Sequence, residues 1–206
     1  TSGSEGDNKE IAKQGRQLYR QVAALLELLA LPPRGRVLSF VPPYHMLGFF
    51  YGLVLPLVLG KETVVATELT GAAMVQLLEK YQPDLVVGTA THYRYLVRAS
   101  ASVSPRATVY LSSGAPLDPA TAEAFASRFG TAVRDFYGTT ELGGVAWRAW
   151  PEPYQPMPGV AFRIDPDSGR LEVRSPWSSA ADQWIATDDV AEPAGEGRFT
   201  LLGRLS

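Results

Sequence analysis

The chain contains no cysteine among its 206 residues. This absence excludes disulfide bonds, thiolate metal sites and cysteine nucleophiles, and it fits a reducing compartment. The formal net charge is −2 and no basic run occurs, so nothing in the charge pattern favours binding to nucleic acid. The longest apolar run, 53–59, contains a proline and is far shorter than a membrane span. We therefore expect a cytoplasmic protein that has neither nucleic acid nor a membrane as a partner.

The composition is that of a globular protein, with 46% hydrophobic and 19% charged residues. A chain of this length buries roughly 70% of its unfolded surface, which is enough for one large or two small domains. No signal-peptide pattern is visible, and the first residue is Thr1 instead of an initiator methionine. We expect that the sequence begins inside a longer protein or has been trimmed.

Hydrophobic periodicity predicts an α/β fold followed by a β-rich segment. Helices are expected at 10–30, 48–59, 70–81, 91–99 and 118–129, and strands at 36–41, 63–66, 84–88 and 107–111. This alternation predicts a mainly parallel sheet with flanking helices. After Gly144 the helical periods stop, and short strands are expected at 145–148, 160–164, 171–174, 184–186 and 199–202. The expected division is an α/β subdomain at 1–144 and a small β-rich subdomain at 145–206.

The segment 135–144, Asp-Phe-Tyr-Gly-Thr-Thr-Glu-Leu-Gly-Gly, follows an apolar alternating run and ends in two glycines. It predicts a strand end that opens into a tight loop, which presents an aromatic face, two hydroxyls and a carboxylate. The segment resembles the signature of the adenylate-forming (ANL) superfamily of acyl- and aryl-CoA synthetases, adenylation domains and luciferases. The resemblance implies that Tyr137 stacks on adenine, that Thr140 meets the AMP phosphate and that Glu141 helps to hold magnesium. Gly138 and Thr139 would complete the nucleotide-binding loop.

The first nine residues, Thr-Ser-Gly-Ser-Glu-Gly-Asp-Asn-Lys, combine glycines, hydroxyls and a terminal lysine. Glycines let backbone N–H groups converge on an anion, but the spacing is not that of a Walker A loop. The segment resembles the family loop that grips the β- and γ-phosphates of ATP, with Glu5 and Asn8 departing from the family pattern. The residues that the resemblance assigns to this role are Thr1, Ser2, Gly3, Ser4, Gly6 and Lys9. A flexible polar terminus is the alternative interpretation.

Two further segments of the α/β part match the family. Small residues at 112–117 follow a strand, at the edge where open α/β sheets bind ligands. The resemblance implies that the backbone of Gly114, Ala115 and Pro116 flanks adenine. His45, in Pro-Pro-Tyr-His-Met-Leu-Gly, would border the carboxylate substrate, although a lone histidine before an apolar helix is more often a core or capping residue. His92 is expected at the start of a helix, facing solvent.

Two segments near the end of the chain complete the pattern. The segment 184–191, Trp-Ile-Ala-Thr-Asp-Asp-Val-Ala, resembles the family stretch whose last aspartate accepts hydrogen bonds from the ribose hydroxyls, here Asp189. Asp188 stands where the family has glycine, and it would add bulk and charge beside the ribose. Arg204 resembles the arginine before the family's hinge, which assists ribose or phosphate binding.

These motifs occur in the family order. They imply an AMP-forming ligase that uses ATP and Mg²⁺ to activate a small acyl or aryl carboxylic acid and then transfers it to CoA or an acyl carrier protein. The length between Tyr137 and Asp189 resembles that of compact ligases from aryl-polyene and xanthomonadin-type pigment pathways. All four lysines lie at or before Lys80, so the lid lysine of the family has no counterpart. We expect a partial core that catalyses adenylation poorly or not at all by itself.

Two other interpretations stay open at this point. The departures Glu5, Asn8 and Asp188 are compatible with a non-catalytic module that binds a nucleotide or an acyl-adenylate. An unrelated α/β protein with accidental motifs is the third interpretation. A lid lysine in a longer parent sequence would favour the enzyme, and its absence would favour the module.

Overall fold

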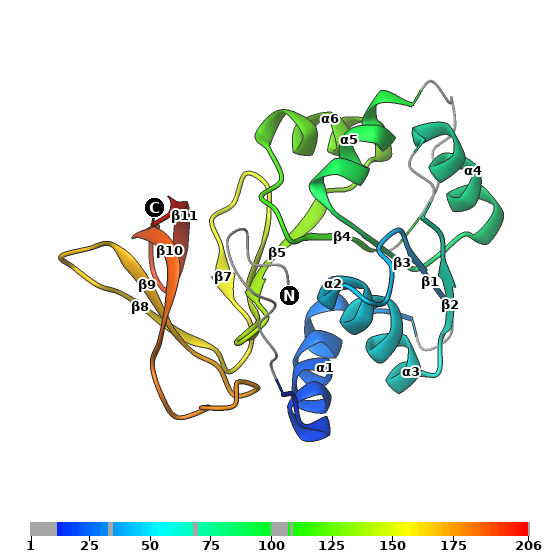
Figure 1. The fold of residues 1–206 in the computed structure, drawn as a ribbon. Helices are drawn as coiled ribbons and strands as arrows, with labels where there is room; N and C mark the ends of the chain where they lie inside the picture. The colour runs from blue at the N-terminus through cyan, green and yellow to red at the C-terminus, as the bar shows by residue number, and fades with distance from the viewer. Residues whose placement is uncertain (1–11, 33–34, 68–69, 100–106, 108, 206) are drawn as a thin grey trace. The chain divides into compact units, whose positions relative to one another are not determined.

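The computed structural model describes residues 12–32, 35–67, 70–99, 107 and 109–205 (Figure 1). The chain divides into two compact units. We call Leu26–Asp135 the central unit, and Thr1–Leu25 together with Phe136–Ser206 the terminal unit. The subdomain boundary expected after Gly144 stays a prediction.

The central unit contains parallel strands, as the alternation of strands and helices predicts. These strands are β1 (Arg36–Ser39), β2 (Glu62–Val65), β3 (Leu85–Gly88) and β4 (Val109–Ser113), in the order β2-β1-β3-β4. Every residue of β3 is buried. A central parallel strand is covered on both faces, which is why its sequence is an uninterrupted apolar run.

Helices cover this parallel sheet. Helices α4 (Gly71–Tyr81), α5 (Ala90–Arg98) and α6 (Pro119–Phe129) lie on one side of the strands, and the segment 46–59 lies on the other (Figure 1). The helix starts follow from capping residues: Thr70 accepts a hydrogen bond from the backbone of Ala73, and Asp118 accepts one from Thr121. Hydrogen bonds from Thr121 also lower the pKa of Asp118.

The segment 46–59 departs from the regular helix that its apolar sequence predicts. It consists of α2 (Met46–Phe49), a π-helical turn η1 (Phe50–Val54) and α3 (Leu55–Leu59). Pro56 lies in the first turn of α3 and has no backbone N–H to donate to the preceding turn. The π-helical turn immediately before it absorbs this break in the hydrogen-bond ladder.

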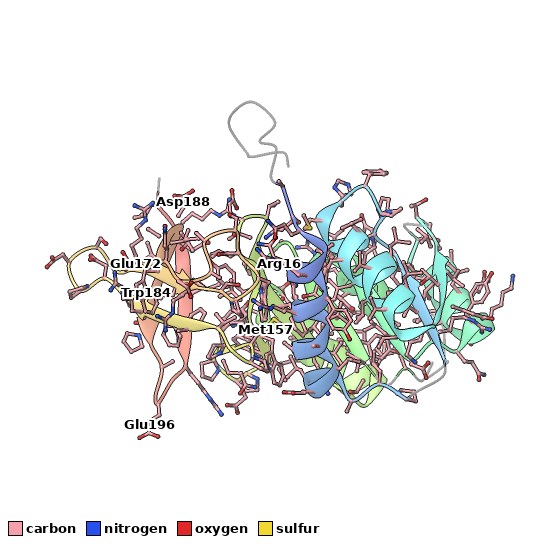
Figure 2. The ribbon with its side chains drawn as sticks, turned by 90° about the horizontal axis from the view of Figure 1, so that it is seen from below. Arg16, Met157, Glu172, Trp184, Asp188 and Glu196 are labelled. Carbon is pink, nitrogen blue, oxygen red and sulfur yellow. The ribbon has the colours of Figure 1, made fainter. Side chains whose placement is uncertain are left out.

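The terminal unit is built mainly from strands. It holds most of α1 (Gly15–Leu29) and of β5 (Val133–Thr139), followed by β6 (Gly143–Ala149) and β7 (Gln155–Pro156). Strands β8 (Ala161–Ile164), β9 (Arg170–Arg174), β10 (Ile185–Pro193) and β11 (Phe199–Arg204) form an antiparallel sheet in the order β11-β10-β9-β8. Glu196, in the turn between β10 and β11, and Asp188 lie at opposite ends of this sheet (Figure 2).

The mainly parallel sheet with helices and the small β-rich part confirm the predicted fold class, but some local predictions were wrong. Helix α1 begins at Gly15, and residues 12–14 are not helical, because the apolar period starts later than residue 10. Strand β5 continues through Thr139, so part of the expected loop is strand. Strand β7 was missed because of its proline, and β10 extends seven residues past the predicted end at Ala186, to Pro193. Within the described ranges, no helix has the length and hydropathy needed to cross a bilayer.

Candidate functional site

A tight turn at residues 140–142 connects β5 to β6 and presents two of the predicted site residues, Thr140 and Glu141. A Cβ atom at Gly138 would lie 2.3 Å from the carbonyl oxygen of Gly143, so the two strands approach closely only because residue 138 is glycine. Gly143 itself has a φ of +71°. The two glycines of the motif are therefore needed for the hairpin that carries the turn.

Two fully buried side chains bind backbone carbonyls at the end of this turn and the start of β6. The indole Nε1 of Trp177 donates a hydrogen bond to the carbonyl of Gly144 at 2.9 Å. The hydroxyl of Ser175 donates to the carbonyl of Leu142 at 3.0 Å. Sequence reasoning missed both residues, because a polar group that anchors a distant turn leaves no local signature. They fix the backbone that follows Glu141.

Lys13 is a cation at the same turn, and sequence reasoning assigned it no role. Its Nζ donates a hydrogen bond to the backbone carbonyl of Glu141 at 2.7 Å. Burial lowers the pKa of Lys13, and the nearby Glu141 carboxylate acts in the opposite direction. The turn therefore combines the hydroxyl of Thr140, the carboxylate of Glu141 and an ammonium group.

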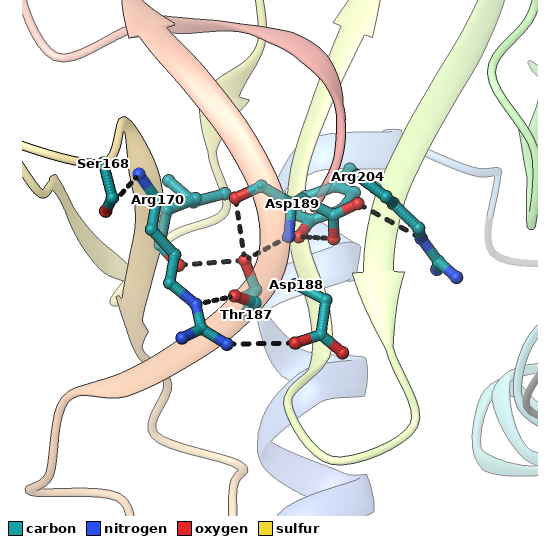
Figure 3. Close-up of polar contacts among 8 residues, drawn as sticks. Ser168, Arg170, Thr187, Asp188, Asp189 and Arg204 are labelled. Carbon is teal, nitrogen blue, oxygen red and sulfur yellow. Dashed lines mark hydrogen bonds and ion pairs between the residues drawn. The ribbon is translucent and has the colours of Figure 1, made fainter. Parts of the chain in front are cut away.

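Tyr137, Asp189 and Arg204 meet from three different strands, and we call them the Asp189 group. The phenol of Tyr137 donates to Oδ2 of Asp189 at 2.7 Å. Nε of Arg204 lies 3.4 Å from Oδ1 of the same carboxylate (Figure 3). The Asp189 side chain is 12% exposed, so both contacts occur in a partly desolvated setting. Burial, and next the hydrogen bond to Asp189, raise the pKa of Tyr137 well above its usual value. The phenol thus stays protonated and acts as a donor.

A bulge in β10 directs the side chain of Asp189 toward Tyr137 and Arg204. The pairing of β10 with β9 shifts register between Ala186 and Val190. The hydroxyl of Thr187 donates to the carbonyl of Leu171 at 2.8 Å and accepts from the backbone N–H of Asp189 at 3.2 Å. Bulges of this kind redirect a side chain at the edge of a ladder.

His45 and the segment Gly114–Pro116 belong to the central unit, and their assigned roles stay predictions. Gly114 follows β4 directly and has a φ of +89°, which favours glycine at this exposed turn. His45 precedes α2, and its side chain makes no capping hydrogen bond. Its exposed ring lies 4.7 Å from that of Tyr44, measured between centroids.

The expectation that His92 faces solvent was wrong. His92 lies in the first turn of α5, as predicted, but it is buried, and its Nδ1 accepts a hydrogen bond from the backbone N–H of Thr89 at 3.0 Å. Its ring stacks on Phe40 with 5.8 Å between centroids. Burial lowers the pKa of His92, which favours the neutral ring that this acceptor role requires. Capping and packing therefore account for this histidine.

The proposed phosphate loop, Thr1, Ser2, Gly3, Ser4, Gly6 and Lys9, lies outside the described residues. Among the residues that the structure does describe, no group of three or more His, Asp or Glu side chains is arranged to hold a metal ion.

The mostly parallel α/β part and the small antiparallel sheet define the architecture of the core of an adenylate-forming enzyme. The chain belongs to the AMP-binding enzyme family, whose sequence model matches residues 1–176. This confirms the family resemblance drawn from the motifs.

Curated relatives are CoA ligases. The chain is 31% identical over 213 residues to 4-coumarate–CoA ligase of Cereibacter sphaeroides, covering 99% of this chain and 47% of that protein. It is 28% identical over 221 residues to benzoate–CoA ligase of Thauera aromatica, covering 93% of this chain and 40% of that protein. The chain thus spans about half the length of the curated relatives that it matches.

Solved structures share the fold. A malonyl-CoA ligase in a ternary product complex with methylmalonyl-CoA and AMP has a TM-score of 0.85 at 22% identity, with 100% of this chain and 52% of that chain covered. O-succinylbenzoate coenzyme A synthetase of Bacillus subtilis, in complex with AMP, has a TM-score of 0.86 at 18% identity, with 99% and 48% covered. At these identities the likeness shows a common fold.

Proposed function

We propose that the chain is the nucleotide-holding part of an AMP-forming acid–thiol ligase. In this reaction a carboxylate oxygen attacks the α-phosphorus of ATP, giving an acyl-AMP and pyrophosphate. A thiol then attacks the acyl carbon, giving a thioester and AMP. Membership in the AMP-binding enzyme family supports this reaction class. The observation that carries the proposal is that Tyr137 and Arg204 both contact the partly buried carboxylate of Asp189.

Asp189 is proposed to accept hydrogen bonds from the ribose hydroxyls. An ionised carboxylate offers about four lone-pair positions. Tyr137 uses one position on Oδ2, and Arg204 lies beside Oδ1. The remaining acceptor capacity matches a vicinal diol, which presents two donors side by side. The guanidinium of Arg204, beside Oδ1, helps to hold this carboxylate in place.

Tyr137 is proposed to stack on adenine, and the turn at 140–142 to meet the phosphates. Because the phenol of Tyr137 is held by Asp189, the ring is fixed before a base arrives. Thr140 supplies a hydroxyl donor at the turn, and the ammonium of Lys13 adds a positive charge beside it. Adenylyl transfer depends mainly on positioning and on neutralising charge, which such groups supply.

Glu141 is proposed as the protein ligand of Mg²⁺. This ion usually keeps several waters and binds one or two carboxylates together with substrate phosphates, so a single glutamate fits it without a full protein cage. The described residues offer no such cage. When bound, the ion would neutralise phosphate charge. Lys13 would hold the backbone of Glu141 in place during binding, through its hydrogen bond to the carbonyl.

The acid is proposed to be a small aromatic carboxylic acid, and the acceptor the thiol of CoA or of an acyl carrier protein. The support is that two relatives are named as 4-coumarate and benzoate ligases. His45 keeps its proposed place beside the acid, and Gly114, Ala115 and Pro116 keep theirs beside adenine. The cytoplasmic location inferred from the lack of cysteine belongs to the same proposal.

Calorimetric titration with AMP and with a non-hydrolysable benzoyl-AMP analogue tests the proposal. We expect the chain to bind both ligands, and Asp189→Asn to weaken both by about 10- to 100-fold, because one acceptor oxygen becomes a donor.

The matched control is Asp182→Asn, which makes the same change of charge at an exposed position of the terminal unit. It should leave both affinities unchanged. Binding of AMP that is equal in the wild type and in Asp189→Asn would contradict the proposed ribose contact. The absence of AMP binding by the folded wild type would contradict nucleotide binding by this chain.

A further inference from the structure

The bulge that carries Asp189 lacks ordinary ladder support on its β9 side, whereas on its other side Asp189 pairs with Arg204 of β11. Ala186 pairs with Glu172 and Val190 pairs with Arg170, so three residues of β10, 187–189, lie opposite Leu171 alone. Asp188 and Asp189 are consecutive in this bulge, which places two carboxylates on neighbouring residues. Their side chains differ in setting, since that of Asp188 is 81% exposed and that of Asp189 is 12% exposed. On the β9 side, side-chain contacts must replace the missing ladder bonds.

Arg170, on the facing strand, binds two groups of the bulge at once. Its Nε donates to the backbone carbonyl of Thr187 at 2.5 Å, and its Nη2 donates to Oδ1 of Asp188 at 3.0 Å (Figure 3). Thr187 lies where the register of β10 shifts against β9, so its carbonyl has no regular ladder partner on β9. The guanidinium of Arg170 donates to this carbonyl instead. The fixed fork of a guanidinium can span two acceptors in this way, which an ammonium cannot reproduce.

Arg170 is itself anchored by the turn before β9. Its backbone N–H donates to the hydroxyl of Ser168 at 3.3 Å. The backbone N–H of Gly169 donates to the carbonyl of Asp165 at 2.8 Å, and the backbone N–H of Ala191 donates to the carbonyl of Gly169 at 2.9 Å. The arginine therefore starts from a fixed backbone, and its two contacts transmit that position to residues 187 and 188.

We propose that Arg170 is a positioning residue for Asp189, and that it makes an aspartate acceptable at position 188. The guanidinium holds the carboxylate of Asp188 on its own side of the bulge and offsets its charge. Asp189 then remains directed at Tyr137 and Arg204. Without Arg170, the bulge would lose the partner of the Thr187 carbonyl, and the unpaired charge of Asp188 would act on Asp189. This inference rests on the proposed role of Asp189 at the ribose.

The test compares the affinity for AMP with that for 2′,3′-dideoxy-AMP, which lacks both ribose hydroxyls. The ratio of the two affinities reports only the ribose contact, so a general loss of stability does not change it. We expect a ratio of about 10 or more in the wild type, falling about three- to tenfold in Arg170→Ala. Arg170→Lys should lower the ratio as well, since an ammonium reaches one acceptor at a time.

Two further variants serve as a control and as a test of the part played by Asp188. Arg198→Ala removes another exposed arginine of the same unit, which pairs with Glu152 at 3.1 Å, and it should keep the wild-type ratio. Arg170→Ala combined with Asp188→Gly removes the charge that Arg170 offsets, and it should recover part of the ratio. An equal loss in the single and the double variant would overturn the part of the proposal that concerns Asp188.

The ribose role of Asp189 and the positioning role of Arg170 are contradicted by different results. A wild-type ratio near one would overturn the ribose role of Asp189 and the inference with it. A high wild-type ratio that Arg170→Ala and Arg170→Lys both retain would overturn the inference alone. If Arg170→Ala does not fold, the ratio measured for Arg170→Lys decides.

Discussion

The hydroxyl of Tyr137 lies 2.7 Å from Oδ2 of Asp189, although the two residues are 52 positions apart in the sequence. The side chain proposed to stack on adenine and the carboxylate proposed to bind ribose are therefore joined by a hydrogen bond. Both belong to the terminal unit. A change in either residue should consequently affect recognition of the base and of the sugar together.

Tyr137→Phe removes this hydrogen bond and keeps the aromatic face. We expect the affinity for AMP to fall about three- to tenfold, because Asp189 loses a charge-assisted donor while stacking remains. Tyr137→Ala should lose more, since the stacking surface disappears too. Isothermal titration measures both. Tyr19→Phe, at a tyrosine that is 65% exposed, is the control, and an affinity for Tyr137→Phe equal to that of the wild type would refute the coupling.

The stability of the chain should fall above pH 10 because of buried tyrosines. Burial raises the pKa of Tyr110 from 10.0 to about 12. The folded state then holds a proton that the unfolded state releases, so this stabilisation is complete below pH 10 and is lost as the pH rises toward 12. The expected slope is about 1.4 kcal/mol per pH unit for one such group.

Urea unfolding at about pH 9.5, 10.5 and 11.5, which run from below the usual pKa of tyrosine toward the shifted one, measures this slope. Tyr110→Phe should make the loss of stability with pH smaller by the share of this tyrosine. Tyr19→Phe, at a tyrosine that is 65% exposed, is the control. A slope that Tyr110→Phe does not change would show that Tyr110 contributes nothing to it.

Gly143 and Gly195 form a matched pair for testing the hairpin geometry. Both have positive φ, at +71° and +88°, but a Cβ at Gly143 would lie 2.5 Å from Oε1 of Gln21, whereas a Cβ at Gly195 meets nothing within 4 Å. Both alanine variants suffer backbone strain, and only the first also crowds its neighbours. We expect Gly143→Ala to lower the free energy of unfolding by about 1–3 kcal/mol more than Gly195→Ala. Equal losses in urea unfolding would argue against this packing.

Trp177→Phe should destabilise the terminal unit by about 1–3 kcal/mol, because the carbonyl of Gly144 loses its donor in a buried setting. Trp184→Phe is the comparison. Its ring centroid lies 4.7 Å from the guanidinium carbon of Arg163 and 5.2 Å from that of Arg174. Contacts of this exposed kind are worth about 0.5–1 kcal/mol. Chemical denaturation that ranks Trp184→Phe as the larger loss would contradict the assigned role of Trp177.

The fold class could be predicted from the sequence because it follows from periodicity. Strand β3 is a continuous buried apolar run, and helix α4 begins at the capping residue Thr70, both visible without coordinates. The π-helical turn before Pro56 could not be foreseen, since an apolar run looks the same in both kinds of helix. The family signature was visible in the same way, because its residues are contiguous.

The parts of the candidate site that sequence reasoning missed are those made by distant residues. Lys13 contacts Glu141 across 128 positions, and Trp177 contacts Gly144 across 33. The departure at Asp188 was visible in the sequence, but its partner Arg170 lies 18 positions away on another strand. The exposure predicted for His92 was wrong because its packing on Phe40 depends on the tertiary structure.

A crystal structure of this chain with AMP tests the central claim most directly. The account predicts both ribose hydroxyls within hydrogen-bonding distance of the Asp189 carboxylate, about 2.6–3.0 Å, with the ring of Tyr137 against the base. Well-defined AMP whose ribose makes no contact with Asp189 would contradict the account.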